Sequence, residues 1–172
     1  MAEFVSVSSV GSSAAGRRRR LQRGAAFTEL ALTLLPSLML ILAAIDLSIP
    51  IFLHSLFNNA ARAGTRYGIT YQTRTGLSHA ESIKKVVQEN AIGFLDGDRE
   101  DLIQVKFYSP ATFQEVSGAD ANDGGNIVEV NITGYRWDAI APLWGTPTGL
   151  TVKATSADRL ETLPRGTQRP AP

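Results

Sequence analysis

The stretch AAFTELALTLLPSLMLILAAI, residues 25–45, decides how the rest of the chain is interpreted. It has 21 residues, and Glu29 is its only charged side chain. A helix rises about 1.5 Å per residue, so about 20 apolar residues cross a hydrocarbon core of roughly 30 Å. The apolar part of a secretory signal is shorter, about 7–15 residues. The sequence therefore predicts a transmembrane helix over residues 25–47.

Charge on the two flanks of this helix predicts its orientation. Five arginines lie within eight residues before it, whereas Asp46 is the first charge after it; the five are Arg17, Arg18, Arg19, Arg20 and Arg23. Basic residues stay on the cytoplasmic side of a membrane, so the N-terminus is expected there and the C-terminal domain outside. A basic arm can also bind nucleic acid. The apolar stretch directly behind it favours the membrane instead, so we expect no nucleic-acid partner.

The chain beyond the membrane predicts an α+β fold. Apolar residues at helical spacing indicate one long N-terminal helix, transmembrane and then amphipathic, from about Ala26 to Tyr67. The apolar stripe expected on its later part is Ile45, Ile49, Phe52, Leu53, Leu56, Ala60, Ala63 and Tyr67. Ser78 and Glu81 have capping-box spacing and begin a second helix that runs to Leu95 and ends before Gly97. Alternating residues then indicate a small antiparallel sheet of three or four strands, with strands near 103–108, 128–133 and 150–155.

These elements divide the chain into five parts. We expect a disordered basic leader, a transmembrane helix, a helix extension with a loop, an extracytoplasmic α+β domain and a flexible tail, over residues 1–24, 25–47, 48–77, 78–163 and 164–172. On the faces of the extension away from its apolar stripe lie Asn58, Arg62 and Arg66. They form either a solvated helix face or contacts to the sheet or to a partner.

Residues with chemical reactivity are scarce. The chain has no cysteine, and His54 and His79 are its only histidines. A disulfide framework or a thiolate metal site is thereby excluded. No nucleophile elbow, zinc-binding helix motif or phosphate loop occurs. We therefore expect no enzyme, no metal and no cofactor, and both histidines are expected at the surface.

The N-terminal block resembles a known family. The order R-G-A-A-F-T-E over residues 23–29, then A-L-T-L-L-P, I-D-L and N-N-A-A-R-A-G-T-R-Y-G, is similar to the TadE family of the tight-adherence (Flp-type) pilus system. The resemblance covers about residues 20–109 and returns at 126–161, with W-D-A-I-A-P-L-W before L-T-V-K-A-T-S-A-D-R. Two features depart from that pattern: the leader is long, and an alanine stands at position 25 with the aromatic residue at Phe27.

The resemblance implies a pilin-like (pseudopilin) protein of a bacterial inner membrane. A prepilin peptidase would cut after Gly24 and leave Ala25 as the new N-terminus. Inner-membrane lipid, the peptidase and other Tad pilus proteins or pilins would be its partners. Glu29, a membrane-embedded acid, would then face the free amine of a neighbouring subunit, which offsets the cost of a carboxylate in the membrane.

Simpler interpretations stand beside these. Glu29 also suits the first turn of a helix, where the helix dipole favours an acid. The arginines are chiefly a topology signal. The protein could be an uncleaved, signal-anchored periplasmic interaction domain, in which case it would keep residues 1–24. An anchored enzyme would need polar groups that converge in a pocket.

Overall fold

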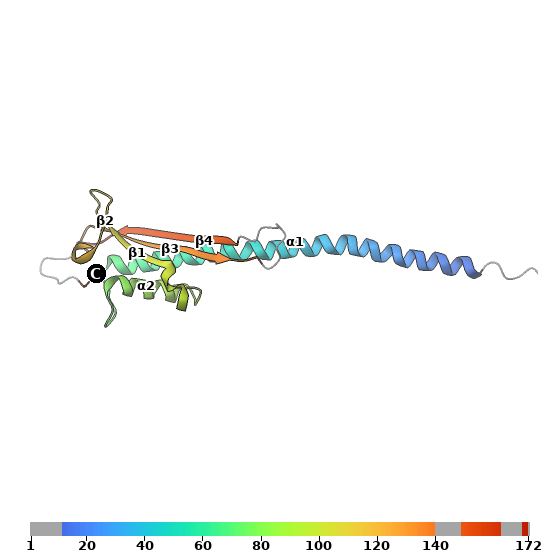
Figure 1. The fold of residues 1–172 in the computed structure, drawn as a ribbon, viewed down its shortest axis with the longest axis horizontal. Helices are drawn as coiled ribbons and strands as arrows, with labels where there is room; N and C mark the ends of the chain where they lie inside the picture. Colours follow the sequence, from blue (N-terminus) through green and yellow to red (C-terminus); the bar gives the residue numbers. More distant parts are fainter. Residues whose placement is uncertain (1–11, 140–148, 163–169, 172) are drawn as a thin grey trace, which may run out of the picture. The chain divides into compact units, whose positions relative to one another are not determined.

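The structure, a computed structural model, describes residues 12–139, 149–162 and 170–171, with side chains described from residue 25 onward. The elements follow in the order α1 (Ser12–Ile69), α2 (His79–Asn90), η1 (Gly97–Leu102), β1 (Ile103–Tyr108), β2 (Glu115–Val116), η2 (Gly118–Asp120), β3 (Ile127–Trp137) and β4 (Leu150–Arg159) (Figure 1). Contacts divide the chain into two units, Met1–Ile45 and Asp46–Pro172. Parts of the expected leader and tail, namely residues 1–11, 163–169 and 172, lie outside the described residues.

The long N-terminal helix is confirmed, but α1 begins at Ser12 instead of near Ala26. Residues 17–23, Arg-Arg-Arg-Arg-Leu-Gln-Arg, are good helix formers, which explains the earlier start. Within the apolar part, the Thr33 hydroxyl donates to the Glu29 carbonyl at 3.0 Å, and the Ser37 hydroxyl donates to the Thr33 carbonyl at 2.7 Å. These polar groups are thus satisfied inside the helix, as a lipid environment requires.

The second helix is confirmed, with its expected N-cap and an earlier end. The Ser78 hydroxyl accepts the Glu81 N–H at 3.3 Å, and the Glu81 carboxylate accepts the Ser78 N–H at 2.9 Å. The helix ends at Asn90, before Leu95, because Ile92 and Gly93 take positive φ values of 52° and 81°. A left-handed residue, most often glycine, commonly follows the C-cap of a helix. Here Ile92 follows the C-cap Ala91 in that conformation, and Gly93 comes next.

Four antiparallel strands form one sheet in the order β2-β1-β3-β4. The three expected strands are present, and the short β2 is the fourth. A register irregularity interrupts the pairing of β3 with β4 between Ile132 and Tyr135, where Gly134 has a φ of 86°. Over this stretch β3 has one residue more than β4, which is a β-bulge. Because of the extra residue, Ile132 and Tyr135 lie on the same face of the sheet and are both buried against the helices.

The core of unit Asp46–Pro172 lies between one face of the sheet and two helices, namely α2 and the part of α1 that belongs to this unit (Figure 1). On α1 the apolar stripe is rotated from the expected one. Phe57 is fully buried with its ring 4.9 Å from that of Tyr135, whereas Phe52 is 54% exposed. The sequence pattern predicts Phe52 in the stripe, but the packing of α1 against the sheet buries Phe57 instead.

His79 corrects another expectation, because its side chain is fully buried. It stacks between the rings of Tyr71 and Phe107, at 5.7 Å and 6.0 Å between centroids. Its Nε2 donates to the Gly68 carbonyl at 3.0 Å, and its Nδ1 has no hydrogen-bond partner among the described residues. Burial lowers the pKa of His79, which keeps the ring neutral.

Candidate functional site

The residues of the expected processing site all lie on α1. Gly24 and the five arginines occupy its first part, and Ala25 follows as an exposed residue. Glu29 is also exposed, one turn further along the same face. The helix therefore brings Ala25 and Glu29 to one side, which is the arrangement that an amine–carboxylate contact between subunits would need.

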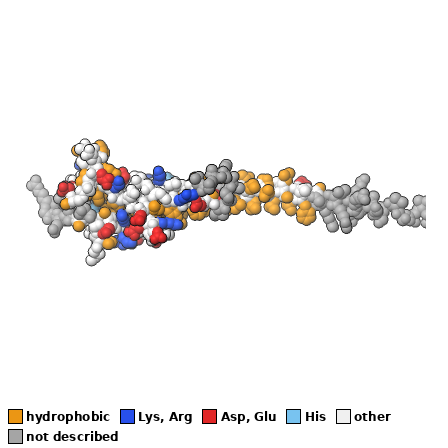
Figure 2. All heavy atoms as spheres, viewed as in Figure 1, with side chains coloured by type: hydrophobic (Ala, Val, Ile, Leu, Met, Phe, Trp, Pro, Cys, Tyr) orange, Lys and Arg blue, Asp and Glu red, His pale blue; other side chains and the backbone are white. Residues whose placement is uncertain are grey.

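The helix surface around Glu29 is apolar and uncovered in the unit Met1–Ile45. Large side chains such as Phe27 and Leu32 are 72% and 77% exposed. The span Ala25–Ile69 contains a window apolar enough to cross a membrane, and only 6% of that window is buried. Figure 2 shows these hydrophobic side chains along the helix, whereas charged side chains are interspersed over the unit Asp46–Pro172. Such a surface is consistent with a single-pass membrane anchor.

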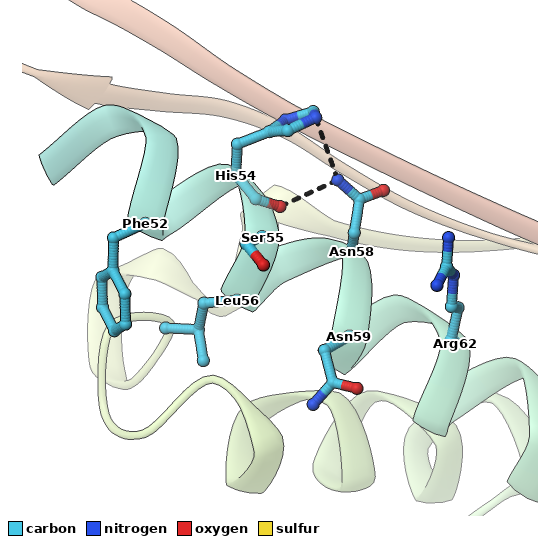
Figure 3. Close-up of a pocket in the computed structure, with 7 residues that line it drawn as sticks. All are labelled: Phe52, His54, Ser55, Leu56, Asn58, Asn59 and Arg62. Carbon is cyan, nitrogen blue, oxygen red and sulfur yellow. Dashed lines mark hydrogen bonds between the residues drawn. The ribbon is translucent and has the colours of Figure 1, made fainter. Parts of the chain in front are cut away.

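Asn58 does not belong to the free surface of α1, because its amide is engaged within the chain (Figure 3). Its Nδ2 donates to the His54 carbonyl at 2.8 Å and to the His54 Nε2 at 3.1 Å. The His54 Nδ1 in turn donates to the Lys153 carbonyl of β4 at 3.0 Å. The ring of His54 therefore links Asn58 to β4, and the Asn58 amide fixes its orientation. His54 itself is exposed, as expected.

Arg62 and Arg66 remain exposed and unengaged. Neither guanidinium makes an ion pair or hydrogen bond with any part of the chain that the structure describes. Two open hollows flank them, of about 730 Å³ and 560 Å³, and both hollows include Asn59 and Arg62. The described lining of the first hollow comes from α1 alone (Figure 3). A single convex helix cannot enclose a small molecule, so this surface suits a protein contact better than a catalytic pocket.

The buried side of α1 packs against α2 and β4 through contacts that the sequence analysis did not predict. At Gly64 an added Cβ would collide with Val87 Cγ2, and at Gly68 it would lie 2.8 Å from Ile83 Cδ1. The buried Thr65 hydroxyl lies 2.9 Å from the Ala61 carbonyl and 3.3 Å from the Ser156 carbonyl of β4. The Gly-x-x-x-Gly spacing was the available signal for this close helix packing.

Comparison with known proteins identifies the N-terminal block. Residues 24–66 match the model of a family described as TadE-like protein. The match begins at Gly24, covers Glu29, and ends at Arg66, so it includes every predicted site residue except the arginines before Gly24. No curated protein matches the chain, and no solved structure matches it. The family resemblance drawn from the sequence is confirmed over these residues.

Proposed function

From the match of residues 24–66 to the family described as TadE-like protein, we propose that this protein is a pilin-like minor component of Tad/Flp-type pilus assembly. A prepilin peptidase removes residues 1–24 and leaves Ala25 as the N-terminus. The helix spans the inner membrane once, with the arginines in the cytoplasm and the α+β domain outside. Its role is structural rather than catalytic.

The exposed apolar surface of α1 is the observation that carries this proposal. Uncovered leucine, isoleucine and phenylalanine side chains extend from Phe27 along the span, which is the surface of a helix that lies in lipid or packs on its neighbours. A carboxylate on this surface costs roughly 2.5–3.5 kcal/mol at mid-bilayer on insertion scales, and less near the interface. The free amine of a neighbouring Ala25 would offset that cost, which makes Glu29 a determinant of how subunits align.

The processing step is tested by the mass of the protein in a host that carries the cognate peptidase. Wild-type protein should lose residues 1–24. Gly24→Leu should keep them, because a branched side chain occupies the position where the peptidase needs a small one. Gly24→Ala is the matched control and should still be cut. Wild-type protein that retains residues 1–24 contradicts the proposal and favours the alternative, an uncleaved signal-anchored periplasmic interaction domain.

The role of Glu29 is tested separately from cleavage. Glu29→Ala should insert normally and be cut, but pilus assembly should fail because the partner of the amine is gone. Thr33→Ala is the matched control, since its hydroxyl bonds only to carbonyls of its own helix. Normal pili from Glu29→Ala would reduce this residue to an acid favoured by the helix dipole.

A further inference from the structure

The exposed side of α1 in the unit Asp46–Pro172 carries a positive surface, which we call the Arg62 face and define as Asn59, Arg62 and Arg66; its arginines pair with none of the described residues. Spacings of three and four residues place these side chains together along one side of the helix. Asp158, a nearby acid, lines the second hollow but makes no ion pair with either arginine; its carboxylate instead accepts the backbone N–H of Arg159 at 2.7 Å. Two adjacent guanidinium groups thus remain available for carboxylates.

The same unit carries an unpaired negative surface, the acidic turn, defined as residues 96–101 with Asp96, Asp98, Glu100 and Asp101. None of these four acids takes part in an ion pair among the described residues. Arg99, the one base of the turn, is held against the domain: its guanidinium lies 5.1 Å over the Tyr135 ring, and its Nη1 donates to the Tyr135 hydroxyl at 3.3 Å. The turn therefore presents an excess of negative charge to solvent.

We propose that the acidic turn of one copy of this chain docks on the Arg62 face of a second copy. Charge complementarity identifies the occupant, because the chain itself supplies the carboxylates that two unpaired guanidinium groups would bind. The proposal rests on the proposed function in that a shared membrane anchor brings copies together with their α1 helices parallel. A symmetric contact between two Arg62 faces would instead oppose like charges.

The positions of the Arg62 face and the acidic turn, measured along the axis of α1, determine the offset between two docked copies. Tyr135 contacts both Phe57 of α1 and Arg99 of η1, so the acidic turn lies near the helical turn that carries Phe57. Arg62 is five residues further along, about 7.5 Å at 1.5 Å per residue. Copies whose α1 helices lie parallel in this unit would then meet with a shift along the helix axis of about one to two turns. Such a contact joins two different surfaces and leaves one of each free at the ends, so it can continue from copy to copy.

Cysteine cross-linking in membranes tests this arrangement directly, because the full-length chain has no cysteine of its own. Two differently tagged copies, one with Asn59→Cys and one with Asp98→Cys, are expressed together and treated with a short bis-maleimide. The expected product is a dimer that carries both tags. Asn59→Cys alone and Asp98→Cys alone should give no dimer. Replacing Asp98→Cys by Thr112→Cys, which lies on the exposed β1–β2 loop, should also give none.

Charge reversal then asks whether the arginines cause the contact. Arg62→Glu with Arg66→Glu on the Asn59→Cys copy should lower the dimer yield at least tenfold. Adding Glu100→Lys and Asp101→Lys to the Asp98→Cys copy should restore it, which a misfolded variant could not do. The inference is overturned by dimers from Asn59→Cys alone, by a yield that charge reversal leaves unchanged, by an equal yield with Thr112→Cys, or by adducts only to other proteins. If no pair gives a dimer while residues 1–24 are removed and pili form, this inference fails and the proposed function stands.

Discussion

Replacing Gly64 by alanine tests how α1 is held in the domain. An exposed glycine in a helix would gain up to about 1 kcal/mol from this change, because alanine is the better helix former. At Gly64 the new methyl group meets Val87 Cγ2, and Val87 is fully buried on α2. A valine in a helix has one strongly preferred rotamer, so it cannot turn away. Overpacking of this kind costs about 1–3 kcal/mol. Subtracting the gain from the cost leaves a loss of about 0–2 kcal/mol. The direct collision with a rigid, fully buried neighbour favours the upper half of that range, a loss of about 1–2 kcal/mol.

Gly68→Ala is the matched control for this prediction. Its new Cβ would lie 2.8 Å from Ile83 Cδ1 and 3.3 Å from Ile83 Cγ1. The terminal Cδ1 can move by rotation about χ2, a freedom that valine lacks. The cost of this contact should roughly cancel the gain in helix propensity, so the free energy of unfolding should change by less than about 0.5 kcal/mol. The two variants therefore compare a new methyl group beside a rigid side chain with one beside a side chain whose end can move.

The assay is urea unfolding of the full-length protein in detergent micelles, followed by tryptophan fluorescence. A double-mutant cycle adds the decisive comparison. Val87→Ala alone leaves a cavity, and in the Gly64→Ala background the new methyl group occupies part of it. The loss in the double variant should therefore be smaller than the sum of the single losses by at least about 0.5 kcal/mol. Additive losses, or a Gly64→Ala protein as stable as wild type, would refute the packing argument.

Two further predictions concern α2. Burial lowers the pKa of His79, so the unfolded chain binds a proton more readily than the folded one, and the free energy of unfolding should fall as the pH drops below about 6.5. His79→Phe should flatten this dependence in unfolding curves between pH 5 and 7.5; an unchanged slope would assign it to another group. Ser78→Ala removes one half of the capping box and should cost about 1 kcal/mol. Ser55→Ala, at an exposed site on α1, should change stability by less than about 0.5 kcal/mol in the same assay.

Local sequence signals were sufficient for most of the fold. The apolar stretch, the Ser78–Glu81 spacing and the alternating strands each depend on residues a few positions apart, and each element formed. The predictions of which side chains are buried were wrong where contacts between residues far apart in the chain determine the burial. Phe57 and Phe52 are both compatible with a helical stripe, and only the position of Tyr135 on β3 selects Phe57. His79 is adjacent to an N-cap, a place where histidine is commonly solvated, yet α2 carries it under Phe107.

The candidate surface shows the same division between local pattern and tertiary contact. Helical spacing places Asn58, Arg62 and Arg66 away from the apolar stripe, which makes all three equally good candidates for a partner. The structure separates them, because His54 joins Asn58 to the Lys153 carbonyl, ninety-nine residues away in the chain. Periodicity identifies which side chains leave the core, but another element decides which of them are already engaged. Among the described residues, His54 and Thr65 make the side-chain hydrogen bonds that join α1 to β4. Arg62 and Arg66 make none there, so both arginines stay free to bind carboxylates from outside the chain.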